Sequence, residues 1–285
     1  MIKNILILFL FVNSIFAIGL KALIIPQSAL TLGGSSTGIA DNISVDLNPA
    51  SLVFIEPYLG FSKNNWFGDL NGQKISVVWN EKNKSYFSFE SLSIADIELR
   101  DEVASENPIG FFGAFWYAFD LSKTIDIKSL SARNFYFGYK VKFNLSKLYT
   151  ESMYGGTVDF GIIKKMSNNL SVGFVTKNLG KEYYNNTSFN TDMTIGLGAS
   201  YKLKIPIKIL SDILYVDSDV MTKLSLITEF PYINVVCGLT NGKSYNDFSV
   251  GLHMIFNDWS FVFSGLKHDN NSLGSPTSIE LIKTF

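Results

Sequence analysis

A strict alternation of apolar and small or polar residues runs through most of this chain and limits what it can fold into. The segment 193–203 is the clearest case, with apolar residues at its odd positions and small or polar residues at its even positions. The apolar set is Met193, Ile195, Leu197, Ala199, Tyr201 and Leu203, and the other set is Thr194, Gly196, Gly198, Ser200 and Lys202. Because successive side chains of a β-strand point to opposite faces, the segment predicts a strand with one apolar face.

The length of these segments separates a membrane barrel from a soluble sandwich. Strands of a sandwich also alternate, but they average about five or six residues. The segments here are about ten residues long, as a tilted strand must be to cross a bilayer. Charged residues make up only 17% of the chain, against roughly 25% in soluble domains. We therefore predict an all-β fold, a transmembrane antiparallel β-barrel whose apolar face meets lipid.

The pattern repeats in about fourteen segments, an even number such as single-chain bacterial barrels have. The segments are 56–62, 73–80, 84–98, 110–120, 133–144, 153–164, 169–178, 193–204, 208–217, 221–230, 232–241, 246–256, 257–266 and 277–285. Short and long connections alternate along most of the chain, which predicts that both termini lie on the periplasmic side. Two connections depart from this rule, because Leu121–Ala132 is too long for its place and Ser218–Val220 is too short.

The beginning of the chain predicts export. Residues 1–17 contain Lys3, the apolar run Ile5–Val12 and a small residue, Ala17, in the order that a secretory signal peptide has. We therefore divide the chain into a signal peptide at 1–17, an N-terminal periplasmic or plug segment at 18–55 and the barrel at 56–285. The predicted location is the outer membrane of a Gram-negative type of cell.

The stretch Thr31–Leu52 is the part of the mature chain that does not alternate, and we predict that it is a plug inside the barrel. Its candidate plug and gating residues are Gly33, Gly34, Gly38, Asp41, Asn42, Asn48, Pro49 and Ala50. Pro49 favours an extended conformation for Asn48, whose side chain can bond to the backbone two residues later and so cap a turn. The glycines allow close packing of the plug against the barrel wall, where Gly196 and Gly198 leave room. A phosphate-binding loop is excluded, since no Gly-Lys-Ser/Thr follows these glycines.

Little in the sequence suggests catalysis, a cofactor or a metal. The formal net charge of −1 gives no reason to expect nucleic acid as a partner. A single cysteine, Cys237, excludes an intramolecular disulfide and a cysteine-based zinc cluster. Of the two histidines, His253 is predicted to be a polar residue facing the lumen, and His268 to lie in a solvated outer loop. We therefore expect a protein that is not an enzyme and that carries no cofactor.

Several motifs resemble those of a known family. The segment Gly33–Asn42, followed by the box Asp46–Leu52, is similar to the N-terminal signature of the FadL-like outer-membrane superfamily, closest to its PorV/PorQ branch. Here Ser51 stands where Gly is commoner. Further similar motifs are Asp159-Phe-Gly161 and Thr176–Gly180. The resemblance implies a fourteen-stranded barrel with an internal hatch.

The same resemblance implies one main function and one alternative. The PorV/PorQ branch implies export or surface handling of cargo by a type IX secretion system, with secreted cargo proteins or secretion-system subunits as partners. The alternative is a FadL-like channel for hydrophobic small molecules. The terminal Phe285 resembles the end of outer-membrane proteins that the barrel-assembly machinery reads, although Lys283 departs from that signal. Outer-membrane lipid and this machinery are therefore further expected partners.

Overall fold

The computed structural model describes residues 25–66, 69–80, 84–100, 106–126, 134–185, 187–216, 218–243, 246–269 and 274–285, and the predicted signal peptide lies outside them. In these residues fifteen antiparallel strands form one sheet. The strands are β1 (Tyr58–Asn65), β2 (Asn71–Trp79), β3 (Ser85–Leu99), β4 (Gly110–Asp126), β5 (Phe135–Leu148), β6 (Glu151–Lys165), β7 (Leu170–Tyr184), β8 (Thr187–Asn190), β9 (Thr194–Lys202), β10 (Ile207–Val216), β11 (Asp219–Glu229), β12 (Ile233–Asn241), β13 (Asn246–Phe256), β14 (Trp259–His268) and β15 (Thr277–Thr284).

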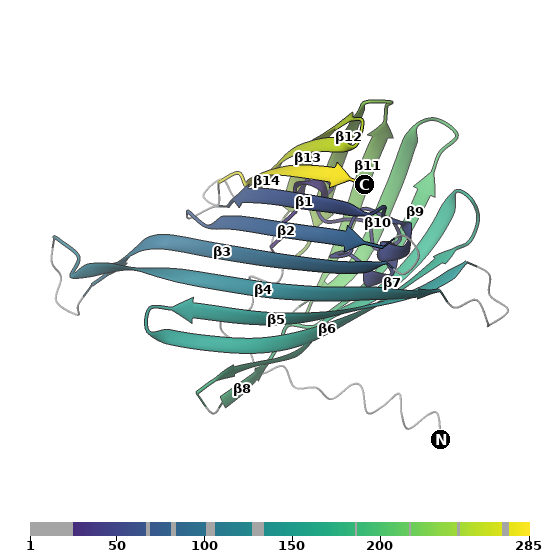
Figure 1. Ribbon diagram of the computed structural model, residues 1–285. Helices are drawn as coiled ribbons and strands as arrows, with labels where there is room; N and C mark the ends of the chain where they lie inside the picture. Colours follow the sequence, from purple (N-terminus) through teal and green to yellow (C-terminus); the bar gives the residue numbers. More distant parts are fainter. Residues whose placement is uncertain are drawn as a thin grey trace, which may run out of the picture.

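The sheet closes on itself, which confirms the predicted fold class. The first strand, β1, pairs with the last, β15, and β6 pairs with β7, so fourteen strands form a continuous wall (Figure 1). The short strand β8 pairs with β7 alone and is an addition to this wall. The sequence predicts a loop where β8 lies, because four residues are too few to show an alternation.

The two faces of the wall have opposite character, as the alternation predicts. On β9, Leu197 points outward and is 59% exposed, whereas Thr194 and Gly196 point inward and are buried. Lumen-facing residues elsewhere include buried Lys74, Glu90, Asp120 and other charged side chains. An apolar outside and a polar inside are typical of barrels that span membranes. Among the described residues, no helix is long and apolar enough to cross a membrane.

The barrel has one even rim and one uneven rim. β1 begins and β15 ends at the even rim, where the N–H of Phe285 donates to the carbonyl of Pro57 at 3.1 Å; we call it the proximal rim. At the opposite, distal rim, β3 to β7 extend further, since they have 14 to 17 residues and the other wall strands 8 to 11. The predicted turn at Leu121–Ala132 is wrong in its first half, because β4 continues to Asp126; residues 127–133 are outside the described part.

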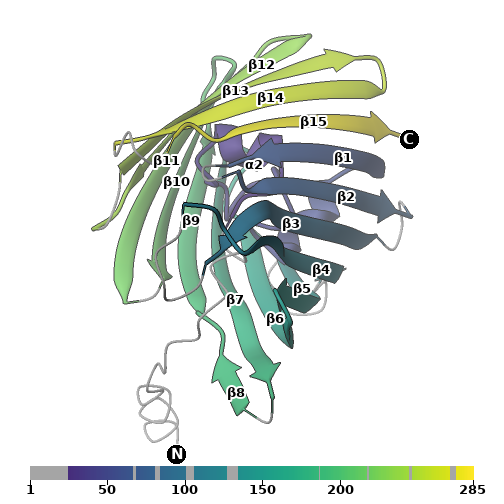
Figure 2. The same cartoon turned by 90° about the vertical axis from the view of Figure 1, so that its left-hand side faces the viewer.

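The N-terminal segment lies inside the barrel. Its described residues, 25–55, contain a short helix α2 (Ala29–Gly33) and a 3₁₀ helix η2 (Pro49–Phe54), and Figure 2 shows α2 within the ring of strands. Most of its side chains are buried, including Leu32, Val45 and Leu52. From here on, the plug segment means residues 25–55.

Candidate plug and lumen site

Glycines on the inward face of the wall make room for the plug segment. A Cβ atom added at Gly138 would overlap the backbone of Pro49 and Ala50, and one added at Gly173 would overlap the carbonyl of Ile39. A Cβ atom at Gly251 would lie 3.0 Å from the Cα of Gly33. The backbones of the wall and the plug segment therefore approach each other more closely at these positions than a residue with a Cβ atom would allow.

Asn48 connects the plug segment to the wall and to itself. Its Oδ1 accepts a hydrogen bond from the N–H of Ala50 at 2.9 Å, as predicted for a turn cap, and Pro49 begins η2. Its Nδ2 lies 2.7 Å from the carbonyl oxygen of Ile39 and 3.2 and 3.3 Å from those of Ile162 and Phe174. The last two residues are directly paired on β6 and β7. This side chain is fully buried, so the sequence identified a residue that the wall holds tightly.

The other predicted plug residues take different positions. Gly33 contacts β13, and Gly34 lies against Ser225 of β11. Gly38 contacts the wall through its backbone N–H, which lies 2.6 Å from Asp212 of β10. Its φ of +142° needs glycine, and a Cβ atom there would meet Ile43 and Leu47 of the plug segment.

Asp41 and Asn42 face the proximal side. The Asp41 carboxylate is 3.2 Å from the Lys208 ammonium of β10, and it accepts a hydrogen bond from Ser200 at 3.1 Å. Asn42 is exposed, and its backbone N–H donates to Asp41 at 2.6 Å. Gly196 and Gly198 of β9 do leave room for the plug segment, but the side chain that fills it is Ile39.

Two wall carboxylates hold backbone N–H groups of the plug segment. Asp212 of β10 accepts from Gly38 at 2.6 Å and from Ile39 at 3.2 Å. Glu280 of β15 accepts from the N–H of Leu30 at 3.1 Å and from the hydroxyl of Ser28 at 2.6 Å. Since β10 and β15 lie on different parts of the ring, the plug segment is attached at separated points.

A buried charge network joins Asp46 of the plug segment to the wall. Its carboxylate lies 2.5 Å from the Lys74 ammonium of β2 and 3.4 Å from the Lys140 ammonium of β5. Lys74 also lies 2.6 Å from Glu90, and Lys140 lies 3.6 Å from Asp120. Burial would raise the pKa of Asp46, but the neighbouring Lys74 and Lys140 outweigh it and hold that pKa well below its usual value. Asp46 is therefore ionised.

Asp46 is not among the site residues predicted from the sequence. The carboxylate oxygens of Asp46, Glu90 and Asp120 lie within 4.8 Å of one another, close enough to hold a metal ion. However, Lys74 and Lys140 contact these same carboxylates, so their negative charge is already balanced by ammonium groups. We assign the cluster to attachment of the plug segment. The sequence does contain a sign of this cluster, because its charged wall residues all occupy inward positions of alternating strands.

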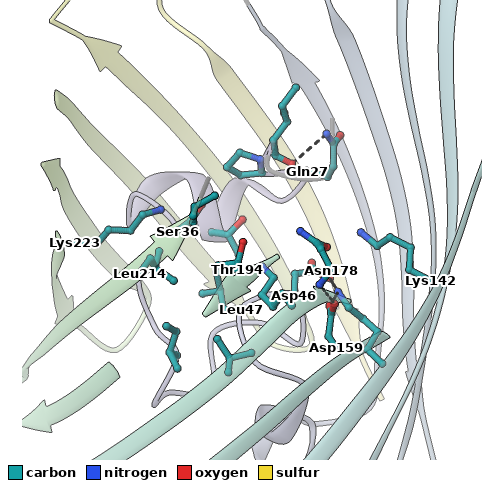
Figure 3. Close-up of a pocket in the computed structure, with 18 of the residues that line it drawn as sticks. Gln27, Ser36, Asp46, Leu47, Lys142, Asp159, Asn178, Thr194, Leu214 and Lys223 are labelled. Atoms are coloured by element: carbon teal, nitrogen blue, oxygen red, sulfur yellow. Dashed lines mark hydrogen bonds and ion pairs between the residues drawn. The ribbon is translucent and has the colours of Figure 1, made fainter. Parts of the chain in front are cut away.

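The plug segment separates two cavities in the lumen. The distal cavity, of about 110 Å³, reaches the distal ends of β9 and β10 at Thr194 and Val216, and Lys223 and Lys142 enter it from opposite walls (Figure 3). The proximal cavity, of about 290 Å³, is lined by Tyr58 and Thr284 at the other rim. Asp46 lines both cavities. It therefore lies at the boundary between the two cavities.

The two histidines lie on the inward face of the wall at different places. His253 of β13 faces the lumen as predicted and lines the proximal cavity. His268 was expected in a solvated loop, but it is buried at the end of β14, with its Nδ1 2.5 Å from the Asp247 carboxylate. The alternation of β14 continues to His268, so its side chain points inward and is buried.

Several solved structures have a similar fold. The chain resembles the CymD monoaromatic hydrocarbon channel with a TM-score of 0.66 at 12% identity, over 90% of this chain and 97% of that one. It resembles a Pseudomonas aeruginosa FadL homologue with a TM-score of 0.64 at 9% identity, over 92% and 99%. For the Pseudomonas putida toluene transporter TodX, the TM-score is 0.62 at 10% identity, over 95% and 98%. At such identities the likeness concerns the fold, which is that of FadL-like outer-membrane barrels. No protein-family model and no curated protein matches the sequence.

Proposed function

We propose that this protein is an outer-membrane channel for hydrophobic small molecules, in which the plug segment closes the lumen and moves to open it. The observation that carries this proposal is the position of Asp46, which contacts the wall lysines and lines the cavities on both sides of the plug segment. The names of the similar structures, a hydrocarbon channel and a toluene transporter, support the same class of cargo. Such a role is not enzymatic.

The distal cavity is suited to a small ligand with an apolar body. Val175, Leu214, Val216 and Met221 line its wall side, and Ile39 and Leu47 line its plug side. Apolar lining with a few polar groups is usual for ligand cavities in proteins. A ligand in this cavity would lie directly against Asp46 and Ile39, so its binding would compete with the contacts that hold the plug segment.

A reversible crosslink tests whether the plug segment must move. The hydroxyls of Ser35, on the plug segment, and Ser249, on β13, are 2.7 Å apart, so cysteines at both positions are placed to form a disulfide. With Cys237→Ser in every variant, S35C/S249C should insert normally. Uptake of toluene into proteoliposomes should fall at least tenfold when this protein is oxidised and recover when it is reduced. The single variant S249C is the matched control. Equal uptake in both redox states of the double variant would exclude movement of this segment as the opening step.

A second candidate function is protein export through a type IX secretion system. It is supported by the similarity of the segments Gly33–Asn42 and Asp46–Leu52 to the PorV/PorQ branch. Its partners would be secreted cargo or secretion-system subunits. Purification of the barrel from its own membranes distinguishes the two functions, because the export role requires that these proteins copurify and that deletion of this chain leaves cargo unreleased.

A further inference from the structure

Part of the wall rises above its neighbours at the distal rim. β7 pairs with β9 up to Lys177, which lies opposite Thr194, the first residue of β9. β7 then continues to Tyr184 and pairs with β8 instead. On the other side, β3 continues beyond Ser93, which lies opposite the first residue of β2. We call this raised part of β3 to β8 the wing; Figure 1 shows β3 and β4 reaching past β1 and β2 at the end away from the C-terminus.

The outer face of the wing carries two lysines on either side of an aromatic residue. Tyr154 of β6 is directly opposite Leu145 of β5 and Tyr183 of β7. Lys147 and Lys181 lie two residues from these partners, on the same outward face, and are therefore the diagonal neighbours of Tyr154. Tyr154 is 63% exposed, and its ring stacks on that of Tyr183 with centroids 5.7 Å apart. Both lysines are exposed, and among the described residues neither forms an ion pair with a carboxylate.

The lysines lie at the boundary of the apolar band. A strand such as β2, of nine residues, rises about 23 Å when tilted by about 40°, close to the roughly 25 Å height of the lipid-facing band of such barrels. The line of paired residues that starts at Asn71, at the distal end of β2, runs through Ser93 and Phe115 to Lys147. Lys181 lies four residues beyond the last β7–β9 pair. Both lysines therefore lie at or beyond the distal ends of the shorter strands β2 and β9, where lipid headgroups are expected.

The chemistry of this surface fits a phosphate-bearing lipid. Two ammonium groups without carboxylate partners are complementary to phosphate, and lysine binds phosphate as a point charge. On the proximal side of Lys147 and Tyr154, on the outward face of β5 and β6, lie Phe143, Leu145 and Phe160, all exposed and apolar. Such a surface can bind acyl chains next to a charged headgroup. A lipid has both parts, whereas a free anion has no acyl chains. Tyrosine at this level is also typical of a membrane interface.

We propose that Lys147, Lys181 and Tyr154 form a docking site for the phosphorylated headgroup of a lipid in the leaflet at the distal rim. The headgroup phosphate lies between the two ammonium groups, and the acyl chains lie along the apolar face of β5 and β6. The site is outside the barrel and separate from the lumen, so it anchors the wing at the membrane surface and does not depend on what passes through the channel.

Lipid binding to the full-length purified barrel tests the site. The protein in detergent is titrated with the diphosphorylated glycolipid lipid A and with a phosphate-free analogue, and bound lipid is counted by native mass spectrometry. Each lysine near an anionic headgroup contributes about fivefold in affinity, so K147Q/K181Q should bind lipid A at least about tenfold more weakly. K147R/K181R should retain binding. K267Q is the matched control, because Lys267 is an exposed outward lysine near the distal end of β14 without a second lysine beside it.

The control measurements keep the result unambiguous. Gel mobility with and without boiling establishes that each variant is a folded barrel. Equal affinity of the wild type and K147Q/K181Q for lipid A would overturn the proposal. So would an equal loss in K267Q, equal binding of the phosphate-free analogue, or displacement of lipid A by millimolar inorganic phosphate, since the last would identify a free-anion site.

Discussion

The carboxylate of Asp46 lies 2.5 Å from the ammonium of Lys74, although the plug segment and the second wall strand are separate parts of the fold. Lys74 is 3% exposed and Asp46 is 24% exposed, so the pair is largely shielded from water. Both residues line the proximal cavity, and Asp46 also lines the distal one. Breaking a buried ion pair by removing one partner is costly because the other charge remains buried. This pair therefore contributes to keeping the plug segment in place.

We predict that Asp46→Asn loosens the plug segment without preventing barrel assembly. The change leaves Lys74 and Lys140 short of one negative charge in a buried site and should cost on the order of 3 kcal/mol. Hydrogen exchange of the amides in residues 25–55 should increase, while that of the wall strands stays slow. The matched control is Asp258→Asn, which removes an exposed pair with Lys283 and should change stability by less than about 1 kcal/mol. Unchanged exchange in Asp46→Asn would show that the other contacts suffice.

The contribution of Asp46 to the stability of the plug segment should change only at acidic pH. Because the folded-state pKa of Asp46 is depressed, its contribution to stability is present above the unfolded pKa of about 3.9 and is lost as the pH falls below that value. We therefore predict that the difference in plug-amide exchange between the wild type and Asp46→Asn, corrected for the intrinsic pH dependence of exchange, is constant between about pH 5 and 8. An increase in the corrected exchange of the wild type at pH 6 that is absent from Asp46→Asn would contradict the assignment.

Asn48 should contribute more than any other asparagine of the plug segment. Asn48→Ala removes the cap of η2 and the amide that lies against carbonyls of β6 and β7, and leaving such buried groups unsatisfied costs about 1–3 kcal/mol. Asn42→Ala, at an exposed position, is the control and should be nearly neutral. Protease cleavage of the plug segment in intact proteoliposomes measures the difference. Failure of Asn48→Ala to insert would instead make this residue a requirement for assembly.

The sequence predicts the wall well and the attachment of the plug segment only in part. Alternation and turn capping both have local causes. The alternation therefore identifies which side of β9 meets lipid, and the Asn-Pro pair identifies Asn48 as a cap for the backbone two residues later. The Asp46–Lys140 contact joins residues far apart in the chain. Closure of the barrel brings these two residues together, and no local sequence pattern predicts which residues meet in this way. β8 was missed because its pairing depends on the extra length of β7.

Substitutions on adjacent residues of β9 test the two faces of the wall. Leu197 is exposed on the outside, and arginine there should cost about 2–4 kcal/mol near the bilayer midplane. A Cβ atom at Gly198 would overlap Asp212 and lie 2.7 Å from the Cβ of Ile39, so Gly198→Ala should displace the plug segment while the wall still forms. We therefore expect Leu197→Arg to reduce the folded fraction in lipid vesicles, measured by gel mobility without boiling. Gly198→Ala should insert normally but raise the leakage of small solutes through the lumen. The reverse pattern, with Leu197→Arg folding fully and Gly198→Ala remaining unfolded, would mean that the lipid-facing and lumen-facing sides of β9 are assigned the wrong way round.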